Sequence, residues 1–151
     1  MKLGIFGGTF DPVHIGHLIV AEFLREELRL DRVLFVPAGQ PWFKTDQYVA
    51  DGNHRLEMVK LAVTDNPHFE ASDVELRRDG PTYTIDTLTT LHDTMSDDID
   101  FTVIVGIDAL NELHRWHRAT DVLDMATVVG VTRPGATEMD RTVLDSIRDG
   151  A

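Results

Sequence analysis

The chain has 151 residues, 42% hydrophobic and 26% charged, which is typical of one ordinary globular domain spanning residues 1–151. A formal net charge of −12 argues against a nucleic-acid partner, because binding a phosphate backbone needs clustered Lys and Arg. The sequence has no membrane-spanning apolar run, no secretory-leader pattern and no cysteine, so we expect a cytoplasmic protein without a membrane segment, a disulfide or a cysteine nucleophile.

The first predicted elements are a strand over Leu3 to Phe6 and an amphipathic helix from Leu18 to Leu30. The stretch between them reads Gly7-Gly8-Thr9-Phe10-Asp11-Pro12-Val13-His14-Ile15-Gly16-His17. A turn between a strand and a helix favours phosphate binding, because N–H groups at a helix start lack partners and the helix dipole attracts anions. His14 and His17 share one face if both belong to the first helical turn.

The same two histidines allow other interpretations. They could merely cap the helix, and the residues alone do not decide between a cap and a phosphate site. A zinc site would need at least a third ligand, and no neighbouring residue supplies an obvious one, so we assign no metal site to the protein.

Strand and helix patterns alternate through the rest of the chain. Strands are expected at Arg32 to Pro37, Phe69 to Leu76, Phe101 to Val105 and Thr127 to Thr132. Helices are expected at about residues 53–64, after a cap at Asp51, at about 85–95, and at 110–125 with an interruption at Trp116-His117. A loop from Ala38 to Ala50 carries the cluster Trp42-Phe43-Lys44. The alternation predicts a doubly wound, Rossmann-like α/β fold, whose parallel sheet binds ligands at the carboxyl ends of its strands.

The opening motif resembles the signature of the nucleotidyltransferase superfamily with a His-x-Gly-His core, which is His14 to His17 here. Its Gly-Gly-Thr-Phe-Asp-Pro form is similar to that of the nicotinate-mononucleotide adenylyltransferase family. Other segments match that family in order and spacing from residue 3 to about residue 135: Pro41 with Lys44, Arg55 with Met58, Pro81 to Leu88, Gly106-x-Asp108, Trp116 and Arg133-Pro134-Gly135.

The resemblance implies that nicotinate mononucleotide attacks the α-phosphorus of ATP, with Mg2+ as cofactor, giving deamido-NAD and pyrophosphate. Such a reaction needs no protein nucleophile, because the substrate phosphate is already a competent one and the protein positions anions and neutralises charge. ATP and nicotinate mononucleotide are therefore the expected small-molecule partners.

Three sets of site residues follow from the resemblance. The catalytic set is His14, His17 and Lys44. The ATP-binding set is Gly7, Gly8, Thr9, Phe10, His14, His17, Gly106, Asp108 and Arg133. The set for the nicotinate nucleotide is Tyr83, Thr84, Trp116 and His117. Without the family, Trp116 would be assigned to the core and Asp108 to a helix cap. His54, His68 and His92 match nothing and are expected to be solvated.

The sequence departs from the family after Gly135. Family members carry a later Ile-Ser-x-Thr-x-x-Arg motif that grips the ATP phosphates, and Thr137 to Ala151 do not contain it, so we expect the C-terminal part of the fold to be short or missing. Two other functions stay open. One is a nucleotide-binding module without turnover; the other is pantetheine-phosphate adenylyltransferase, against which Trp116 and the Tyr83-Thr84-x-Asp86-Thr87 segment argue. The oligomeric state is also open, a homo-oligomer included.

Overall fold

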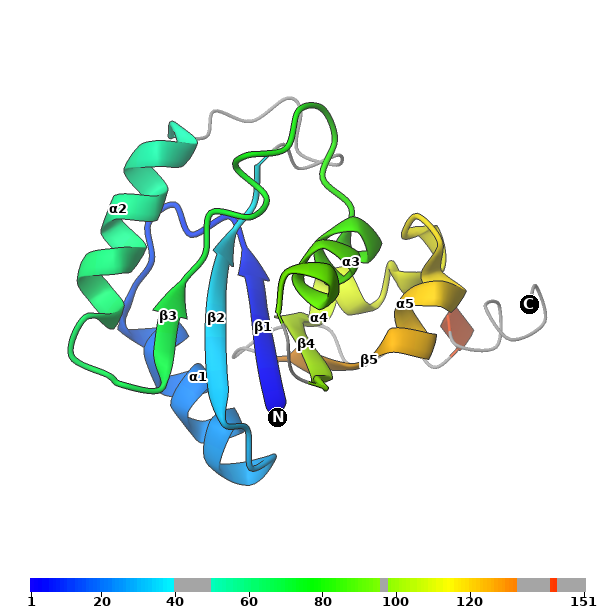
Figure 1. Ribbon diagram of the computed structural model, residues 1–151, viewed down its shortest axis with the longest axis horizontal. Coiled ribbons are helices and arrows are strands. Elements are labelled where there is room, and N and C mark those ends of the chain that lie inside the picture. Colours follow the sequence, from blue (N-terminus) through cyan, green and yellow to red (C-terminus); the bar gives the residue numbers. More distant parts are fainter. Residues whose placement is uncertain (40–49, 96–97, 133–141, 144–151) are drawn as a thin grey trace.

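The fold is built on a parallel sheet with β1 at its centre (Figure 1). The computed structural model describes residues 1–39, 50–95, 98–132 and 142–143. Within these residues five strands lie in the order β3-β2-β1-β4-β5: β1 (Lys2–Gly8), β2 (Arg32–Pro37), β3 (Phe69–Ala71), β4 (Asp100–Gly106) and β5 (Ala126–Val131). The chain builds outward from β1 first on one side and then on the other, which is the doubly wound topology that the sequence predicts.

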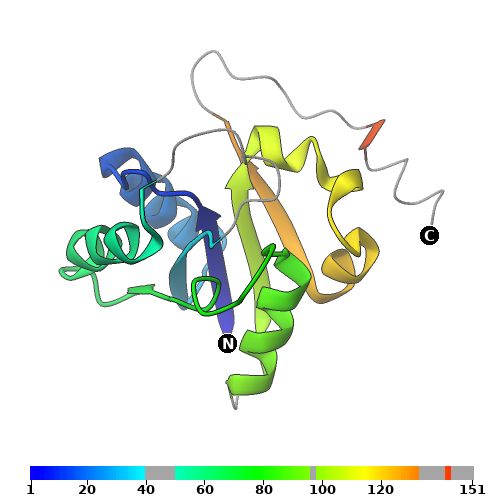
Figure 2. The ribbon, with the colours of Figure 1, turned by 90° about the horizontal axis from the view of Figure 1, so that it is seen from above.

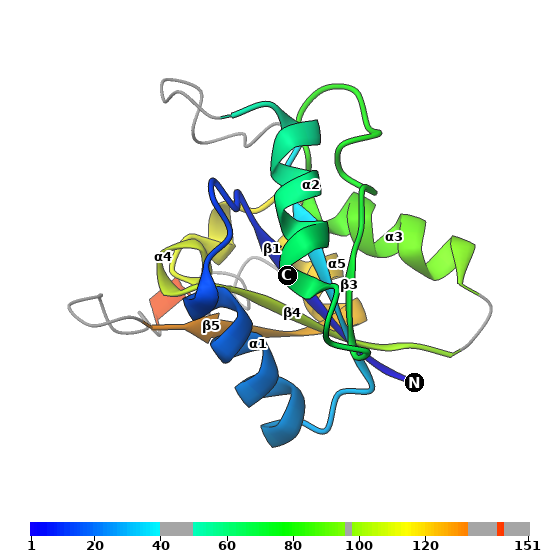
Figure 3. The ribbon, with the colours of Figure 1, turned by 90° about the vertical axis from the view of Figure 1, so that its left-hand side faces the viewer.

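The helices connect the strands and cover both faces of the sheet. They are α1 (Ile15–Glu27), α2 (Gly52–Val63), α3 (Thr84–Thr94), α4 (Ile107–Leu110), the 3-10 helix η1 (Leu113–Arg115) and α5 (Ala119–Met125). Viewed from above, α1 and α2 lie on one side of the strands, and α3 and α5 lie on the other (Figure 2). Figure 3 shows the same separation of α1 from α3 in a side view.

Alternate residues of the strands pack into two core layers. Leu3 and Ile5 contact the layer that contains Leu88 of α3 and Val122 of α5. Phe6, the next residue of β1, belongs to the opposite layer. That layer includes side chains from α1 and α2: Ala21, Val59 and Val63. Strands buried on both faces are continuously apolar, and for this reason the sequence pattern locates β1, β2 and β4 well.

Three predicted elements differ from the structure. The strand expected over Phe69 to Leu76 ends at Ala71, because the backbone then makes local turn bonds such as Leu76 N–H to Asp73 O at 2.9 Å. The helix expected over Leu110 to Met125 is divided into η1 and α5, with the break at Trp116-His117 that the sequence predicts. The first helix begins at Ile15 rather than Leu18, so both histidines of the motif stand at its start.

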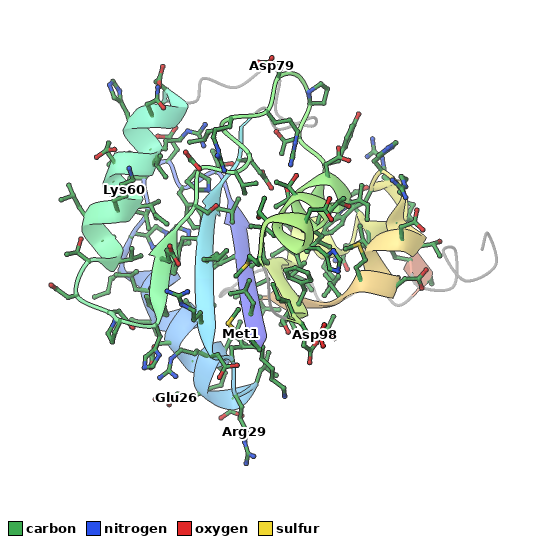
Figure 4. All side chains as sticks on the ribbon, viewed as in Figure 1. Met1, Glu26, Arg29, Lys60, Asp79 and Asp98 are labelled. Atoms are coloured by element: carbon green, nitrogen blue, oxygen red, sulfur yellow. The ribbon has the colours of Figure 1, made fainter. Side chains whose placement is uncertain are left out.

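The strands are parallel, so their carboxyl ends lie along the same edge of the sheet; those of β1 and β2 point upward in Figure 1. Asp79, in the turn before α3, stands at this edge, whereas Met1 and Asp98 lie at the opposite one (Figure 4). The amino group of Met1 donates to the carbonyl of Asp98 at 2.9 Å there. No helix in the described part of the chain is both long and apolar enough to cross a membrane.

Candidate active site

The turn after β1 holds His14 and His17 against each other at the start of α1. His14 is the N-cap residue: its Nδ1 accepts a hydrogen bond from the Gly16 N–H at 3.1 Å, and Nδ1 of His17 accepts one from the His14 N–H at 3.0 Å. This reciprocal arrangement is a capping box made of two imidazoles, whose rings stack with centroids 3.8 Å apart. Because each Nδ1 accepts a hydrogen bond, the proton of each neutral ring resides on Nε2.

Both rings therefore offer an N–H donor away from the helix. Among the described residues, neither Nε2 has a hydrogen-bond partner. Burial lowers the pKa of His17 below its usual value of 6.5, and the nearby His14 lowers it further, so the ring is a neutral donor at pH 7. The capping interpretation is thus confirmed, and it leaves the opposite nitrogens available for an anion.

Phe10 packs against His17 of the histidine pair. Its ring is 3% exposed and packs edge-on against His17 with centroids 5.0 Å apart. Its backbone adopts the left-handed conformation, with φ of 51°. Any ATP contact at Phe10 must therefore come from its backbone amide, because the side chain belongs to the core.

The ends of β1 and β4 leave the backbone open beside the histidine turn. A Cβ placed on Gly7 or Gly106 would meet none of the described atoms within 4 Å. The two strands are parallel neighbours, with Phe6 paired to Ile104, and the strand order reverses between them, since β2 and β3 lie on one side of β1 and β4 and β5 on the other. Open backbone at such a switch point is the usual nucleotide site of α/β proteins. Gly106 is also the N-cap of α4, which leaves Asp108 exposed in its first turn and overturns the alternative of Asp108 as the cap.

Arg55 fixes the histidine turn to the start of α2, a role that the sequence did not indicate. It is 2% exposed, its Nη1 donates to the Thr9 carbonyl at 2.8 Å, and its Nε donates to the Ala50 carbonyl at 2.8 Å. Asp11 accepts a hydrogen bond from the Ala50 N–H at 3.0 Å. Burial lowers the pKa of Arg55, and the carboxylates of Asp11 and Asp51 oppose this effect. The only sequence signal was the match of Arg55 to the family in order and spacing.

The second predicted group comes together at the start of α3. Tyr83 is the N-cap residue of α3 and Thr84 is its first residue. The ring of Tyr83 lies 4.4 Å from that of His117, centroid to centroid. Trp116 is half-buried: its Nε1 donates to the Ala109 carbonyl at 3.1 Å, and its indole packs against both the α3 layer and the cluster under α4. The indole N–H is therefore used within the protein, and stacking of its face on a ligand stays a prediction.

Lys44 and Arg133 lie outside the described residues, as does the Trp42-Phe43-Lys44 cluster, so their assigned roles stay predictions. His54, His68 and His92 are exposed, which confirms that they are solvated. Within residues 1–39, 50–95, 98–132 and 142–143, no three His, Asp or Glu side chains gather as a metal site.

Comparison with known proteins places this geometry in a family. A family model described as cytidylyltransferase-like matches residues 5–148. A probable nicotinate-nucleotide adenylyltransferase of Dehalococcoides mccartyi is 43% identical over 145 residues, covering 96% of this chain and 71% of the relative. Another, of Thermomicrobium roseum, is 50% identical over 134 residues, covering 89% of this chain and 62% of the relative.

Solved structures agree on the fold. Nicotinic acid mononucleotide adenylyltransferase of Plasmodium falciparum, complexed with NaAD, superposes with a TM-score of 0.77 at 19% identity, over 96% of this chain and 70% of that one. A putative nicotinate-nucleotide adenylyltransferase of Vibrio parahaemolyticus gives a TM-score of 0.65 at 22% identity, over 99% of this chain and 88% of that one.

The Rossmann-like fold and the family match define the class: this chain is a nucleotidyltransferase of the cytidylyltransferase-like family. More narrowly, the identity to curated relatives shows that it belongs to the nicotinate-nucleotide adenylyltransferase family. The resemblance seen in the sequence is thereby confirmed.

Proposed function

We propose that this chain transfers the adenylyl group of ATP to nicotinate mononucleotide, forming deamido-NAD and pyrophosphate in NAD biosynthesis. The observation that carries the proposal is the stacked His14 and His17 pair, whose Nδ1 atoms accept the capping hydrogen bonds and whose Nε2 atoms are left as donors. The backbone is open at Gly7, which precedes the same turn, and at Gly106, at the end of the neighbouring strand β4. The relatives named nicotinate-nucleotide adenylyltransferase support the choice of substrates.

The reaction forms one phosphorus–oxygen bond and breaks another. A phosphate oxygen of nicotinate mononucleotide attacks the α-phosphorus of ATP, and the bond from that phosphorus to the bridging oxygen breaks, so that pyrophosphate departs with the electron pair. His14 and His17 donate hydrogen bonds to phosphate oxygens and stabilise the charge that develops there. Backbone amides of Gly8, Thr9 and Phe10 contribute further donors, and Lys44 and Arg133 are assigned to the phosphates by the family match.

The nicotinate nucleotide occupies the other part of the edge, at the start of α3. Tyr83, His117 and Trp116 supply flat rings for the pyridine, and the Thr84 N–H is a donor for its carboxylate. Gly106 and Asp108 then lie on the ATP side, next to β1.

Enzymes of this kind generally use a divalent metal ion with ATP, and we propose Mg2+. Mg2+ keeps several waters and takes one or two protein carboxylates with substrate phosphates. The described site has the exposed carboxylate of Asp108 near Gly106 but no acidic cluster. These residues fit a metal that enters as part of the ATP complex.

The test is formation of deamido-NAD and pyrophosphate by the purified chain from ATP, Mg2+ and nicotinate mononucleotide. We expect turnover with this substrate and much less with phosphopantetheine; equal turnover with phosphopantetheine would overturn the proposal. Calorimetric binding of nicotinate mononucleotide or deamido-NAD without any turnover would instead favour a nucleotide-binding module. Nicotinamide mononucleotide as a parallel substrate measures the preference for the carboxylate.

A further inference from the structure

A polar network connects the turn after β3 to α3, and neither predicted substrate set includes its members. Thr87 is 1% exposed, and its hydroxyl donates to Oε2 of Glu75 at 2.8 Å while accepting from Nη1 of Arg78 at 3.2 Å. Nη2 of Arg78 donates to the hydroxyl of Thr90, one helical turn further along, at 3.3 Å. Glu75 and Arg78 of the turn are thus hydrogen-bonded to two side chains on one face of α3.

The carboxyl of Glu75 is poised between its two protonation states. Burial raises its pKa to about 7, although the hydrogen bond from Thr87 and the charge of Arg78 act in the opposite direction. Both the acid and the carboxylate accept the hydrogen bond from Thr87. The link between the turn and α3 therefore persists through neutral pH.

The turn is itself held against the sheet. A Cβ on Gly39, just beyond β2, would lie 2.5 Å from the Glu75 carbonyl and 3.0 Å from the Thr82 hydroxyl. Only glycine allows this close approach. The network thereby connects the end of β2 to the start of α3.

The network ends at the peptide between Tyr83 and Thr84. The Thr87 hydroxyl lies 3.4 Å from the Tyr83 carbonyl, which also accepts the N–H groups of Asp86 at 3.1 Å and Thr87 at 3.2 Å. A trans peptide is planar, so holding this carbonyl toward the helix points the Thr84 N–H outward. No side chain among the described residues caps this end of α3. The Thr84 N–H is thus a fixed donor at the proposed nicotinate subsite.

We infer that Glu75, Arg78 and Thr87 are positioning residues for the second substrate: they hold the Tyr83–Thr84 peptide so that its N–H and the Tyr83 ring meet the nicotinate group. This inference rests on the proposed function. It assigns specificity for the nicotinate nucleotide to side chains that do not touch it.

Thr87→Val keeps the shape of the side chain and removes its hydroxyl, and Arg78→Met removes the other end of the network. In both variants we expect the KM and the calorimetric Kd for nicotinate mononucleotide to rise about tenfold, with the KM for ATP within about twofold of wild type. Thr87→Ser and Glu75→Gln retain the hydrogen bonds and should remain near wild type. Thr94→Val is the matched control, because its hydroxyl donates to the Thr90 carbonyl at the far end of α3.

A second readout does not depend on activity. In the ligand-free protein, Thr87→Val should shift the Thr84 amide resonance, whereas Thr94→Val should leave it unchanged. Unchanged binding of nicotinate mononucleotide in a folded Thr87→Val or Arg78→Met variant would overturn the inference, as would equal rises in both KM values. A wild-type chain that does not use nicotinate mononucleotide would overturn the proposed function, and the Thr84 amide would still report whether the network fixes the peptide.

Discussion

At the scale of single residues, His14 and His17 combine two tasks that are usually separate. Each Nδ1 accepts a backbone hydrogen bond at the start of α1, and this fixes where each Nε2 proton lies. The same capping that stabilises the helix therefore presets the tautomer required for donating to phosphate. A substitution at either position disturbs stability and proposed catalysis together unless the cap is retained.

His17→Gln separates the two tasks, because glutamine at the third helical position restores a capping box. We expect the free energy of unfolding to stay within about 0.5 kcal/mol of wild type, while kcat falls on the order of a hundredfold. His17→Ala should lower kcat to the same extent and should also lower the free energy of unfolding by roughly 0.5 to 2 kcal/mol. Urea unfolding and initial rates measure the two effects, and exposed His92→Ala serves as the control. Full activity in the folded glutamine variant would refute the role of the imidazole.

The lowered pKa of His17 makes stability depend on pH. Below its usual value of 6.5, the unfolded chain binds a proton at this position more readily than the folded protein does. The free energy of unfolding should therefore decrease as the pH falls through 6.5, and protonation of Nδ1 would also remove the cap. Urea unfolding can be compared at pH 7.5 and pH 5.5, about one unit above and below the usual pKa. The free energy of unfolding should decrease more for wild type than for His17→Gln between these two pH values. An equal decrease in both proteins would show that the pH dependence of stability comes from another residue.

The pH dependence of stability that comes from Glu75 is opposite in sign to that from His17. Its folded pKa of about 7 lies above the usual 4.5, so the folded protein binds more protons between these values and stability decreases as the pH rises through them. Glu75→Gln removes this cost, although Arg78 then faces a neutral group. We expect the variant to be more stable than wild type at pH 8 by on the order of 1 to 3 kcal/mol, with the advantage vanishing near pH 4.5. Denaturant unfolding across this range tests both the sign and the window.

At the scale of secondary-structure elements, Arg55 joins two pieces of the site that the chain separates. Its donors bind the Thr9 carbonyl in the turn after β1 and the Ala50 carbonyl before α2. Asp51, which caps α2 by accepting from the Asn53 N–H at 2.8 Å, stands between Ala50 and Arg55. The start of α2 thus sets the position of the turn that carries the histidines.

Arg55→Met should destabilise the fold by about 1 to 3 kcal/mol, because two partly buried carbonyls lose their donors. It should also raise the KM for ATP more than the KM for nicotinate mononucleotide, the reverse of the Thr87→Val pattern. Lys60→Met on the same helix is the control, since the Lys60 ammonium pairs with Glu57 at an exposed site. Equal stability of the two variants would show that Arg55 does not hold the turn.

At the scale of the whole molecule, both proposed subsites lie along one edge of the sheet. The ATP side lies beside β1 and β4, and the nicotinate side lies at the start of α3. A ligand that spans the two sides stabilises elements from both halves of the fold. Homo-oligomer formation and a cytoplasmic location stay predictions from the sequence.

Deamido-NAD at a hundred times its Kd should therefore raise the free energy of unfolding by about 2.7 kcal/mol, with no change for phosphopantetheine at the same concentration. His17→Gln and Thr87→Val should each reduce the thermal shift, because each weakens a different end of the ligand's site. Thermal unfolding with each ligand gives the comparison. A shift produced equally by both ligands would contradict the proposed specificity.

The residue pattern alone determined the fold class, the place of the turn that carries His14 and His17, and several boundaries. Buried parallel strands are continuously apolar, so β2 was predicted at its observed bounds of Arg32 to Pro37. Asp51 was predicted correctly as the cap of α2, because a cap is a local interaction between residues close in sequence. The Gly-Gly-Thr-Phe-Asp-Pro and His-x-Gly-His motifs identified the family from the sequence, because their residues are also close together in the chain.

Tertiary structure decided how the separate pieces meet. Three contacts join segments that are distant in sequence: the ring contact of Tyr83 with His117, the hydrogen bond from Arg55 to Thr9, and the hydrogen bond from Thr87 to Glu75. No local spacing encodes such contacts, because they depend on which elements the fold brings side by side. The early end of β3 has the same origin: Val74 packs into the core, and the turn that carries Glu75 and Arg78 replaces the expected strand.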